Sequence, residues 1–393
     1  MDPDISHAVL ALLDYCRRQG FAGHDPYDAL DSRLFNATPF RHSKICRLVL
    51  TQALKRLPFN LRPLLLIQKE QNPKALALFL AAGHKLSKLG IPGTENIAGE
   101  MVRRLEALRS KGTTYWCWGY SFPWQTRTII VPRGEPNLVC TAFVAEALLD
   151  AYEKTRESRL LDMANSAGQY ILKELYWTDR DGTASFSYPL QGMRSKVHNA
   201  NFLGAALLCR LYRHTGYRQS LEPALKVVRY SAARQRENGA WDYGELSTQG
   251  WADNFHTGYN LCALRSIARN AETTEFDAII RRGFEFYRNH FFRDDGAPKY
   301  FHDRTYPIDA HSVAQSIITL LAFRDFDAIN ADLAHIVANW AIENMRDREG
   351  YFYYQVKPFY KNRISYMRWT QAWMLLSLST LLEHSRESAL SKS

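Results

Sequence analysis

The sequence predicts an all-α fold, a single (α/α)6 toroid built from six helical hairpins. Three observations predict it: a glycine-aromatic turn recurs at a nearly constant interval, an apolar segment follows each turn, and an amphipathic segment follows each apolar one. A fixed period of this kind is the signature of a repeat protein, in which each unit buries its apolar face against its neighbours. We expect residues 1–393 to form one toroidal domain with an insertion at about residues 20–72.

The repeated turn combines a charged or polar residue, a glycine and then aromatic residues. It occurs at Gly182, Gly239, Gly296 and Gly350, so the intervals are 57, 57 and 54 residues. Glycine suits this position because it adopts positive φ without the strain that a Cβ would cause. The segment around Gly119 is a degenerate earlier copy.

Apolar segments rich in small residues follow these turns and also precede the first of them. They are apolar nearly all round, which is typical of helices buried on both sides, whereas the segments between them carry charge on one face. We therefore expect inner and outer helices. The six inner helices are predicted to start near residues 74, 137, 198, 253, 309 and 367. The clearest of the five intervening outer helices are residues 221–236, 275–291 and 330–346.

Closure of the ring requires a sixth outer helix. The last inner helix runs almost to residue 393, so no segment after it can supply this partner. We expect the N-terminal helix, residues 5–18, to pack beside the last inner helix and close the ring. The insertion, which contains HDPYDALDS and several prolines, should lie across one end of the toroid.

Composition and charge narrow the class of protein. Hydrophobic residues make up 46% and charged residues 23% of the chain, which allows a large buried core. The formal charge of +10 is scattered without a run of five or six basic residues, which argues against a nucleic-acid partner. An acidic substrate or a neighbouring membrane surface fits this charge better.

The N-terminal residues and the cysteines indicate the compartment. The stretch MDPDISHAVLALLDYCRRQG lacks the pattern of a signal peptide and of a membrane-spanning helix, so we expect a cytoplasmic location. The six cysteines form no C-x-x-C pair and most lie in apolar stretches, which is typical of buried free thiols. We expect no cofactor.

Three motifs resemble known families. The turn QRENGAW is similar to the Gln-Trp repeat of terpene cyclases and prenyltransferases, which are α/α toroids. RWTQAWM resembles the R-G-Q-A-W stretch of six-hairpin glycosidases that remove unsaturated uronic acids, although Trp369 and Thr370 depart from it. The combination of HDPYDALDS, DNFHTGYN, YPIDAHSVAQ and YMRWTQAWM most resembles bacterial proteins of exopolysaccharide and capsule biosynthesis clusters. That resemblance covers most of the chain and implies this fold and a polysaccharide-linked role.

The candidate chemistry lies at one rim of the predicted toroid. Inner helices run parallel, so their N-termini open on the same rim and polar residues there converge. Asp253 with His256 and Asp309 with His311 occupy matching positions in neighbouring repeats. Because histidine is the usual proton-transfer group near neutral pH, we predict that these four residues and Tyr366 are catalytic.

Residues around this sector are predicted to bind the substrate. Aromatic faces stack on the C–H faces of sugar rings, and an arginine binds a sugar carboxylate in a two-pronged fork. The candidates are Trp118, Trp124, Arg127, His198, Asn201, Trp241, Trp251, Tyr259, Arg368 and Gln371. The alternative is that the aromatic residues directly after each glycine turn are structural and plug the end of the toroid.

Each polar candidate also has a structural interpretation. Asp253 and Asp309 stand where helix N-caps belong, and a capping carboxylate needs no further role. His256 and His311 are alternatively buried histidines with satisfied hydrogen bonds. A metal site built from all four is conceivable, but no ligand-spacing motif such as H-E-x-x-H occurs, so we expect no metal.

The leading hypothesis is a carbohydrate-active enzyme that acts on an acidic oligosaccharide or polysaccharide, with peripheral contact to membrane-bound glycan machinery. In one mechanism, His256, His311 or Tyr366 moves a proton at C5 of a uronic acid, while Arg368 and an asparagine neutralise the carboxylate, which gives epimerisation or elimination. In another, Asp253 and Asp309 are the two carboxylates of glycoside hydrolysis.

Two other classes remain open at this point. Terpene or prenyl chemistry is suggested by the Gln-Trp-like turn, but no acidic run such as D-x-D-D occurs on a predicted inner helix. A non-catalytic glycan-binding protein would keep the aromatic residues without needing paired histidines and acids.

Overall fold

Six inner helices form a closed ring in the computed structural model, which describes residues 3–390. They are α4 (Pro73–Lys88), α6 (Leu138–Thr155), α8 (His198–Thr215), α10 (Asn254–Asn270), α12 (Ala310–Ala322) and α14 (Ala372–Leu390), the last preceded by a π-helical turn at Met367–Gln371. Each inner helix contacts the next, and α14 contacts α4. The predicted starts lie within one residue of the observed ones, with the π-helical turn counted as the start of the last inner helix.

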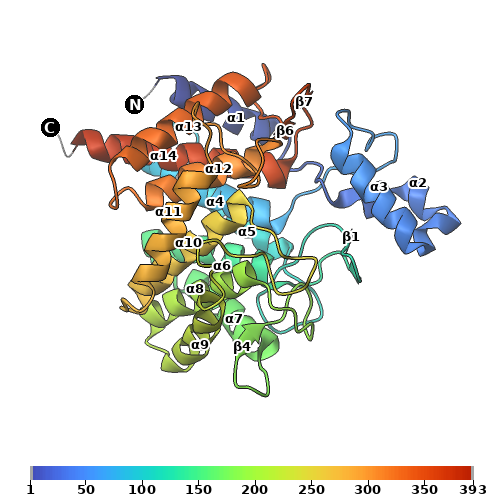
Figure 1. Ribbon diagram of the computed structural model, residues 1–393. Coiled ribbons are helices and arrows are strands. Elements are labelled where there is room, and N and C mark those ends of the chain that lie inside the picture. Colours follow the sequence, from blue (N-terminus) through green and yellow to red (C-terminus); the bar gives the residue numbers. More distant parts are fainter. Residues whose placement is uncertain (1–2, 391–393) are drawn as a thin grey trace.

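An outer helix packs against each inner one. The outer helices are α5 (Ile97–Ala107), α7 (Ser158–Tyr170), α9 (Leu221–Ala232), α11 (Asp277–His290), α13 (Ile329–Met345) and α1 (Pro3–Arg18). The N-terminal helix α1 lies beside α13 and α14 and completes the outer ring (Figure 1). The predicted (α/α)6 toroid, closed by its N-terminal helix, is confirmed.

One continuous apolar core fills the space between the two rings. The inner helices bury residues on all sides, as their sequences predict, while the outer helices bury one stripe each. None of the helices between residues 3 and 390 is long and apolar enough to cross a membrane.

Each glycine turn lies between an outer helix and the next inner helix of the chain, as Gly239 lies between α9 and α10. All four predicted turn glycines have positive φ, between +81° and +97°. A Cβ at Gly239 would lie 2.4 Å from the backbone oxygen of Arg282 on α11, and a Cβ at Gly350 would lie 2.5 Å from the backbone oxygen of Ala11 on α1. The turn at Gly350 therefore packs on α1 as the turn at Gly239 packs on α11, so α1 occupies the position of a sixth outer helix.

Short strands shape the loops at the rim. Two hairpins pair β1 (Trp124–Gln125) with β2 (Ile130–Val131) and β3 (Tyr176–Thr178) with β4 (Ala184–Phe186). A third sheet has the order β5 (Ile308–Asp309), β6 (Gln355–Val356) and β7 (Lys361–Asn362), all antiparallel. Shorter helical turns occupy Ile171–Leu175 and Arg218–Ser220.

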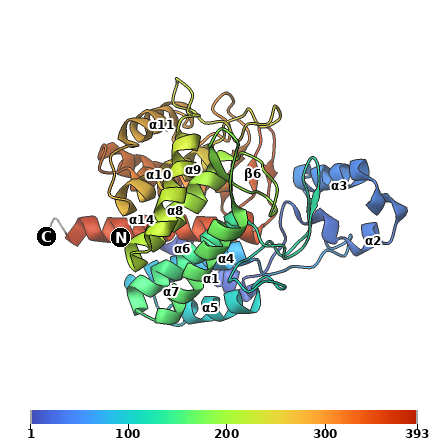
Figure 2. The ribbon, with the colours of Figure 1, turned by 90° about the horizontal axis from the view of Figure 1, so that it is seen from below.

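Residues 20–72, between α1 and α4, form a separate feature. They contain helical turns at Asp28–Asp31 and Pro39–His42 together with α2 (Arg33–Asn36) and α3 (Lys44–Arg56). The flanks lie on the rim, where Gly23 pairs with Glu70 and His24 with Tyr366. α2 and α3 extend outward from the toroid on a small core of their own (Figures 1 and 2), while one side of α3 contacts the β1 strand at the rim.

The glycine turns give a test of ring closure. Gly350→Ala should lower the free energy of unfolding by about 3 kcal/mol, because the new Cβ combines positive φ with a clash against the backbone of α1. Gly182→Ala is the matched control: its φ is +81° but nothing lies within 4 Å, so it should cost only about 1 to 2 kcal/mol. Equal losses in urea unfolding would contradict the packing of this turn on α1.

Candidate active site

A cavity of about 380 Å³ opens at the rim where the inner helices begin. Every inner helix, or the turn that precedes it, contributes a side chain to its wall. These residues are Lys74, Val139, Asn199, His256, His311 and Arg368. The arrangement follows from the parallel inner helices, whose first turns meet at one end of the ring.

Asp253 and His256 form an oriented pair at the start of α10. The buried Asp253 carboxylate caps the helix by accepting from the His256 backbone N–H at 2.9 Å, and the same carboxylate lies 2.9 Å from Nδ1 of the His256 ring. A carboxylate at Nδ1 fixes the ring and leaves Nε2 as the nitrogen that can take up or release a proton. His256 lines the cavity, whereas Asp253 lies behind it.

His311 lies in the wall beside Tyr259. The Tyr259 hydroxyl is hydrogen-bonded to Nε2 of His311, while the buried Nδ1 has no partner among the described residues. Burial lowers the pKa of His311 well below its usual value, and the nearby Lys74 and Arg368 lower it further. His311 is therefore a neutral imidazole at neutral pH. The ring centroids of His256 and His311 both lie 5.9 Å from that of Tyr259, so two imidazoles share one sector of the cavity.

Asp309 has a different environment from Asp253. It caps α12 through the His311 backbone N–H and also accepts from Gln355 Nε2 at 2.6 Å and Trp369 Nε1 at 3.0 Å. Burial raises its pKa to about 6 although these hydrogen bonds oppose the shift. Asp309 is fully buried and absent from the cavity wall, so it positions Trp369 and the start of α12.

Lys74 is a buried amine in the first turn of α4. Its Nζ lies 4.0 Å from the ring centroid of Phe143 and 5.2 Å from that of Tyr259, and among the described residues it has no ion-pair partner. Burial lowers its pKa well below the usual value, and the neighbouring Arg368 contributes to this lowering. A cavity-lining amine without a counterion is a site for a negatively charged group of a ligand.

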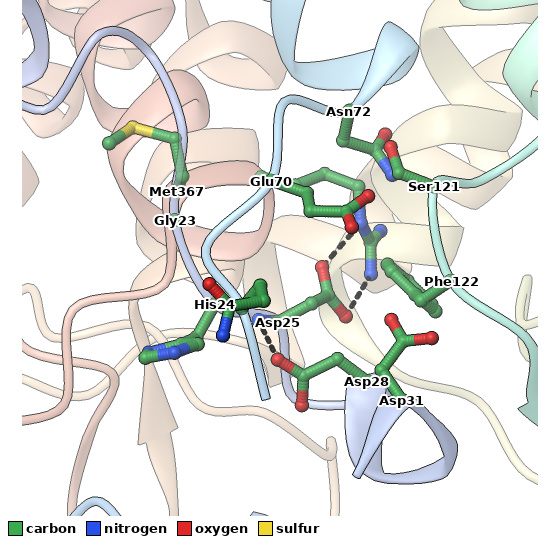
Figure 3. A pocket seen from close by; sticks show the side chains of 12 residues that line it. Gly23, His24, Asp25, Asp28, Asp31, Glu70, Asn72, Ser121, Phe122 and Met367 are labelled. Carbon is green, nitrogen blue, oxygen red and sulfur yellow. Dashed lines mark hydrogen bonds and ion pairs between the residues drawn. The ribbon is translucent and has the colours of Figure 1, made fainter. Parts of the chain in front are cut away.

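Arg368 lines the same cavity but its charge is already paired. Its Nε and Nη2 donate to the two carboxylate oxygens of Asp25 at 2.6 and 2.8 Å, and both side chains are buried (Figure 3). The guanidinium also lies over the ring of Tyr120 at 4.8 Å. The Asp25 backbone N–H donates to Asp28, which in turn pairs with Arg62 at 2.6 Å. This buried chain of charges joins the residues after α1 to the start of the last inner helix.

Aromatic rings make up most of the remaining wall. Tyr243 and Trp251 are stacked with centroids 4.6 Å apart, and Tyr120 stacks on Phe122. A second hollow of about 270 Å³ adjoins the cavity and shares Trp124, Tyr243 and Trp251 among others. The two hollows are therefore neighbours along one side of the rim.

Seven of the predicted residues line this cavity. They are Trp124, Arg127, Trp251, His256, Tyr259, His311 and Arg368. No Asp or Glu is found among the described residues that form its wall. The wall therefore combines aromatic faces, two imidazoles and basic groups, with the carboxylates of Asp253 and Asp309 behind it.

Three other predicted residues lie around Ser231 instead. His198 Nδ1 is 3.2 Å from Ser231 Oγ, Asn201 Nδ2 donates to the same oxygen at 2.9 Å, and Trp241 Nε1 donates to the Ser231 backbone oxygen at 3.1 Å. All three side chains are buried outside the cavity. They hold the turn between α9 and α10 against α8, which matches the structural alternative for Trp241.

Trp118, Tyr366 and Gln371 are also buried away from the cavity. Trp118 donates to the Leu105 backbone oxygen at 2.8 Å, and the Gln371 amide exchanges hydrogen bonds with the backbone of Phe352. The Tyr366 ring lies under the guanidinium of Arg62 at 4.8 Å. The structure therefore places these three where they support the rim.

Sequence reasoning missed Lys74 and Asp25. Lys74 had one visible signal, because it is a charged residue in the first turn of an otherwise apolar inner helix. Asp25 stands in the HDPYDALDS motif, but its partner Arg368 is 343 residues away and nothing local points to it. Between residues 3 and 390, no group of three or more His, Cys, Asp or Glu residues is arranged to hold a metal ion.

Comparison with known proteins defines the fold. No known family model matches the chain, and no curated protein matches its sequence. Among solved structures, the cellobiose 2-epimerase from Bacillus thermoamylovorans is 12% identical with a TM-score of 0.62, covering 81% of this chain and 90% of that chain. The GH76 alpha-mannanase from Bacteroides thetaiotaomicron is 13% identical with a TM-score of 0.61, covering 81% and 87%.

A third similar structure spans nearly the whole chain. It is a variant of an unsaturated glucuronyl hydrolase with dGlcA-Glc-Rha-Glc, 10% identical with a TM-score of 0.64, covering 98% of this chain and 97% of that chain. At these identities the likeness shows a common fold, the (α/α)6 toroid.

Breaking the buried pair of Asp25 and Arg368 should strongly destabilise the fold. Asp25→Ala leaves an uncompensated buried guanidinium, so we expect a loss of about 3 to 5 kcal/mol in the free energy of unfolding in urea. Asp14→Ala, which breaks the exposed pair with Arg18, is the matched control and should cost less than about 1 kcal/mol. A loss as small as that of the control would contradict this role of the pair.

Proposed function

We propose that this protein is a carbohydrate-active enzyme that acts on a uronic-acid-containing saccharide by moving a proton at C5. The observation that carries the proposal is the composition of the cavity wall, which has two imidazoles and an unpaired amine but, among the described residues, no carboxylate. Such a wall suits an anionic substrate and acid-base chemistry. The similar structures named above act on or bind saccharides, which supports the substrate class.

The proposed reaction uses both histidines. One imidazole removes the C5 proton, and the electron pair is delocalised into the C6 carboxyl group as an enolate. Return of a proton to the opposite face, from the Tyr259 hydroxyl that is hydrogen-bonded to His311, forms a new C5–H bond and gives the epimer. Alternatively, departure of the C4 oxygen substituent breaks the C4–O bond and gives a 4,5-unsaturated sugar. His256 is the better candidate for the base because the Asp253 carboxylate at Nδ1 fixes its ring and leaves Nε2 to take up the proton.

Recognition of the carboxylate falls to Lys74. Arg368 is the residue predicted to bind the carboxylate, but its Nε and Nη2 already donate hydrogen bonds to Asp25. Lys74 has no counterion among the described residues, and its Nζ lies among the rings of Phe143, Tyr259 and Trp373. A substrate carboxylate would restore the charged form of this amine and would be stabilised by it as negative charge develops on the enolate.

Glycoside hydrolysis by two carboxylates is the weaker mechanism. That reaction needs one carboxyl group on each side of the glycosidic bond. Asp253 and Asp309 both lie behind the wall, each occupied by helix capping and by hydrogen bonds to neighbouring side chains. The site therefore favours proton transfer at carbon over acid-catalysed cleavage of the glycosidic bond.

The alternative classes have less support. The Gln-Trp-like turn of terpene cyclases is structural in this chain, since Gln235 Nε2 donates to the backbone oxygens of Gly239 and Ile279 and Trp241 is buried. A glycan-binding protein without activity would have no need for the Asp253–His256 pair. The adjoining second hollow supports an oligosaccharide or polysaccharide as substrate, and the resemblance to capsule-cluster proteins supports a biosynthetic role in contact with glycan machinery at the membrane.

Exchange with solvent tests the proton transfer. In D2O, the protein should incorporate one deuterium at C5 of a uronic-acid oligosaccharide or release a 4,5-unsaturated product, detected by NMR. His256→Ala and His311→Ala should each lower the rate of deuterium incorporation or of double-bond formation by at least about 100-fold. His7→Ala, on the exposed side of α1, should leave it unchanged.

Two outcomes of that experiment would overturn the proposal. One is cleavage of the glycosidic bond in which the product has neither deuterium at C5 nor a new double bond. The other is binding of uronic-acid oligosaccharides without any conversion across a range of them, which would favour a glycan-binding protein.

A second experiment tests the role of Lys74. Lys74→Met should weaken binding of a uronic-acid oligosaccharide by about 10 to 100-fold, the effect of losing one charged hydrogen bond, and should change binding of the corresponding neutral sugar little. Lys226→Met, an exposed lysine on α9, is the control. Equal losses for acidic and neutral sugars in calorimetry would show that Lys74 does not recognise the carboxylate.

A further inference from the structure

A basic and apolar surface lies beside the cavity, and it is formed by residues 33–69, here called the arm. This stretch contains eight Lys and Arg residues and no Asp or Glu. Of the eight, only Arg62 forms an ion pair in the part of the chain that the structure describes, with the buried Asp28. Elsewhere most arginines of the inner and outer helices pair with acids, such as Arg210 with Glu146. The arm therefore carries an uncompensated positive charge.

Bulky apolar side chains project from the same surface. Ile45 and Val49 lie one helical turn apart on α3 and are both exposed, with a fractional exposure of 72% for Ile45. The opposite face of α3 buries Thr51 and Leu54. Further exposed apolar side chains on the arm are Leu34, Phe40, Phe59, Leu64 and Leu66. More than a third of the exposed large apolar side chains of the described residues are thus gathered in this one projecting segment.

The β6–β7 hairpin extends this surface. It packs beside the end of α3, where Asn362 Nδ2 donates to the Leu57 backbone oxygen at 3.0 Å. Its tip carries Phe359, which is 97% exposed, next to Lys357 and Lys361. Figure 1 shows β7 on the side of the toroid that faces α3. The arm and the hairpin tip therefore combine protruding apolar side chains with basic groups that, apart from Arg62, have no acidic partner among residues 3–390.

We propose that the arm and the β6–β7 hairpin tip dock on a bilayer that contains anionic lipids. Basic groups on a surface of this kind are attracted to anionic headgroups, and the apolar side chains between them insert at the headgroup and acyl boundary. The apolar residues protrude singly from a projecting arm rather than line a groove, which suits a fluid bilayer better than a folded partner. The inference does not rest on the proposed function.

Docking would bring the cavity to the membrane surface. α3 contributes Leu48 and Gln52 to the cavity wall, and Arg47 Nε donates to Gln125 of the β1 strand at 2.8 Å, so the arm and the cavity mouth are adjacent. A saccharide held at the membrane would then reach the cavity without leaving the surface.

Vesicle flotation with the full-length chain tests this surface. The protein should float with vesicles of phosphatidylcholine mixed with phosphatidylglycerol and much less with phosphatidylcholine alone, and added salt should weaken binding. Replacing Ile45 and Val49 by Ser should weaken binding by at least about tenfold. Lys44→Gln and Arg56→Gln should each weaken it by about fivefold.

Matched controls separate docking from folding. Ile329→Ser and Lys226→Gln remove an exposed apolar and an exposed basic side chain outside the arm and should leave binding unchanged. Since all substituted side chains are exposed, circular dichroism and thermal unfolding should match the wild type.

Several results would overturn the proposal. Failure to float with the anionic vesicles would do so and would favour an acidic protein partner. Self-association in sedimentation that the Ile45 and Val49 substitutions abolish would assign the surface to a second copy of this chain. Unchanged flotation of these variants would show that another surface binds the lipid.

Discussion

The buried ion pair between Asp25 and Arg368 organises this end of the molecule. It joins the segment after α1 to the turn that starts the last inner helix, across 343 residues of sequence. Through Asp28 and Arg62 the same chain of charges reaches the base of the arm. The pair therefore fixes where the arm stands relative to the cavity. It also neutralises the guanidinium that would otherwise be the strongest anion site in the wall, which leaves Lys74 in that role.

The distribution of carboxylates around the cavity follows one principle. Asp253 and Asp309 lie behind the wall and Asp25 lines a smaller adjoining hollow, and each is held by an arginine, a histidine or hydrogen-bond donors. The side of the wall that faces the cavity carries imidazoles, an amine and aromatic faces. Because a buried charge needs a partner, the missing negative charge is expected to come from the substrate. In the proposed function, stability and substrate specificity would therefore depend on the same arrangement.

The sequence predicted the fold better than the site, for physical reasons. Inner helices are buried on both sides and begin at capping residues such as Asp253, so periodicity and caps located them to within a residue. The pairing of Asp253 with His256 is local to one helical turn and was visible. Asp25 and Lys74 act through contacts between distant segments, which no local pattern encodes. The projection of α2 and α3 depends on a small separate core rather than on the repeat, so the repeat pattern carries no information about it.

A structure of the protein with a bound uronic-acid oligosaccharide tests the central claim most directly. The account predicts the sugar carboxylate within hydrogen-bonding distance of Lys74 Nζ, with C5 placed between the rings of His256 and His311. A ligand seated outside the cavity, or one whose carboxylate faces away from Lys74 while its glycosidic bond approaches Asp253 or Asp309, would contradict it.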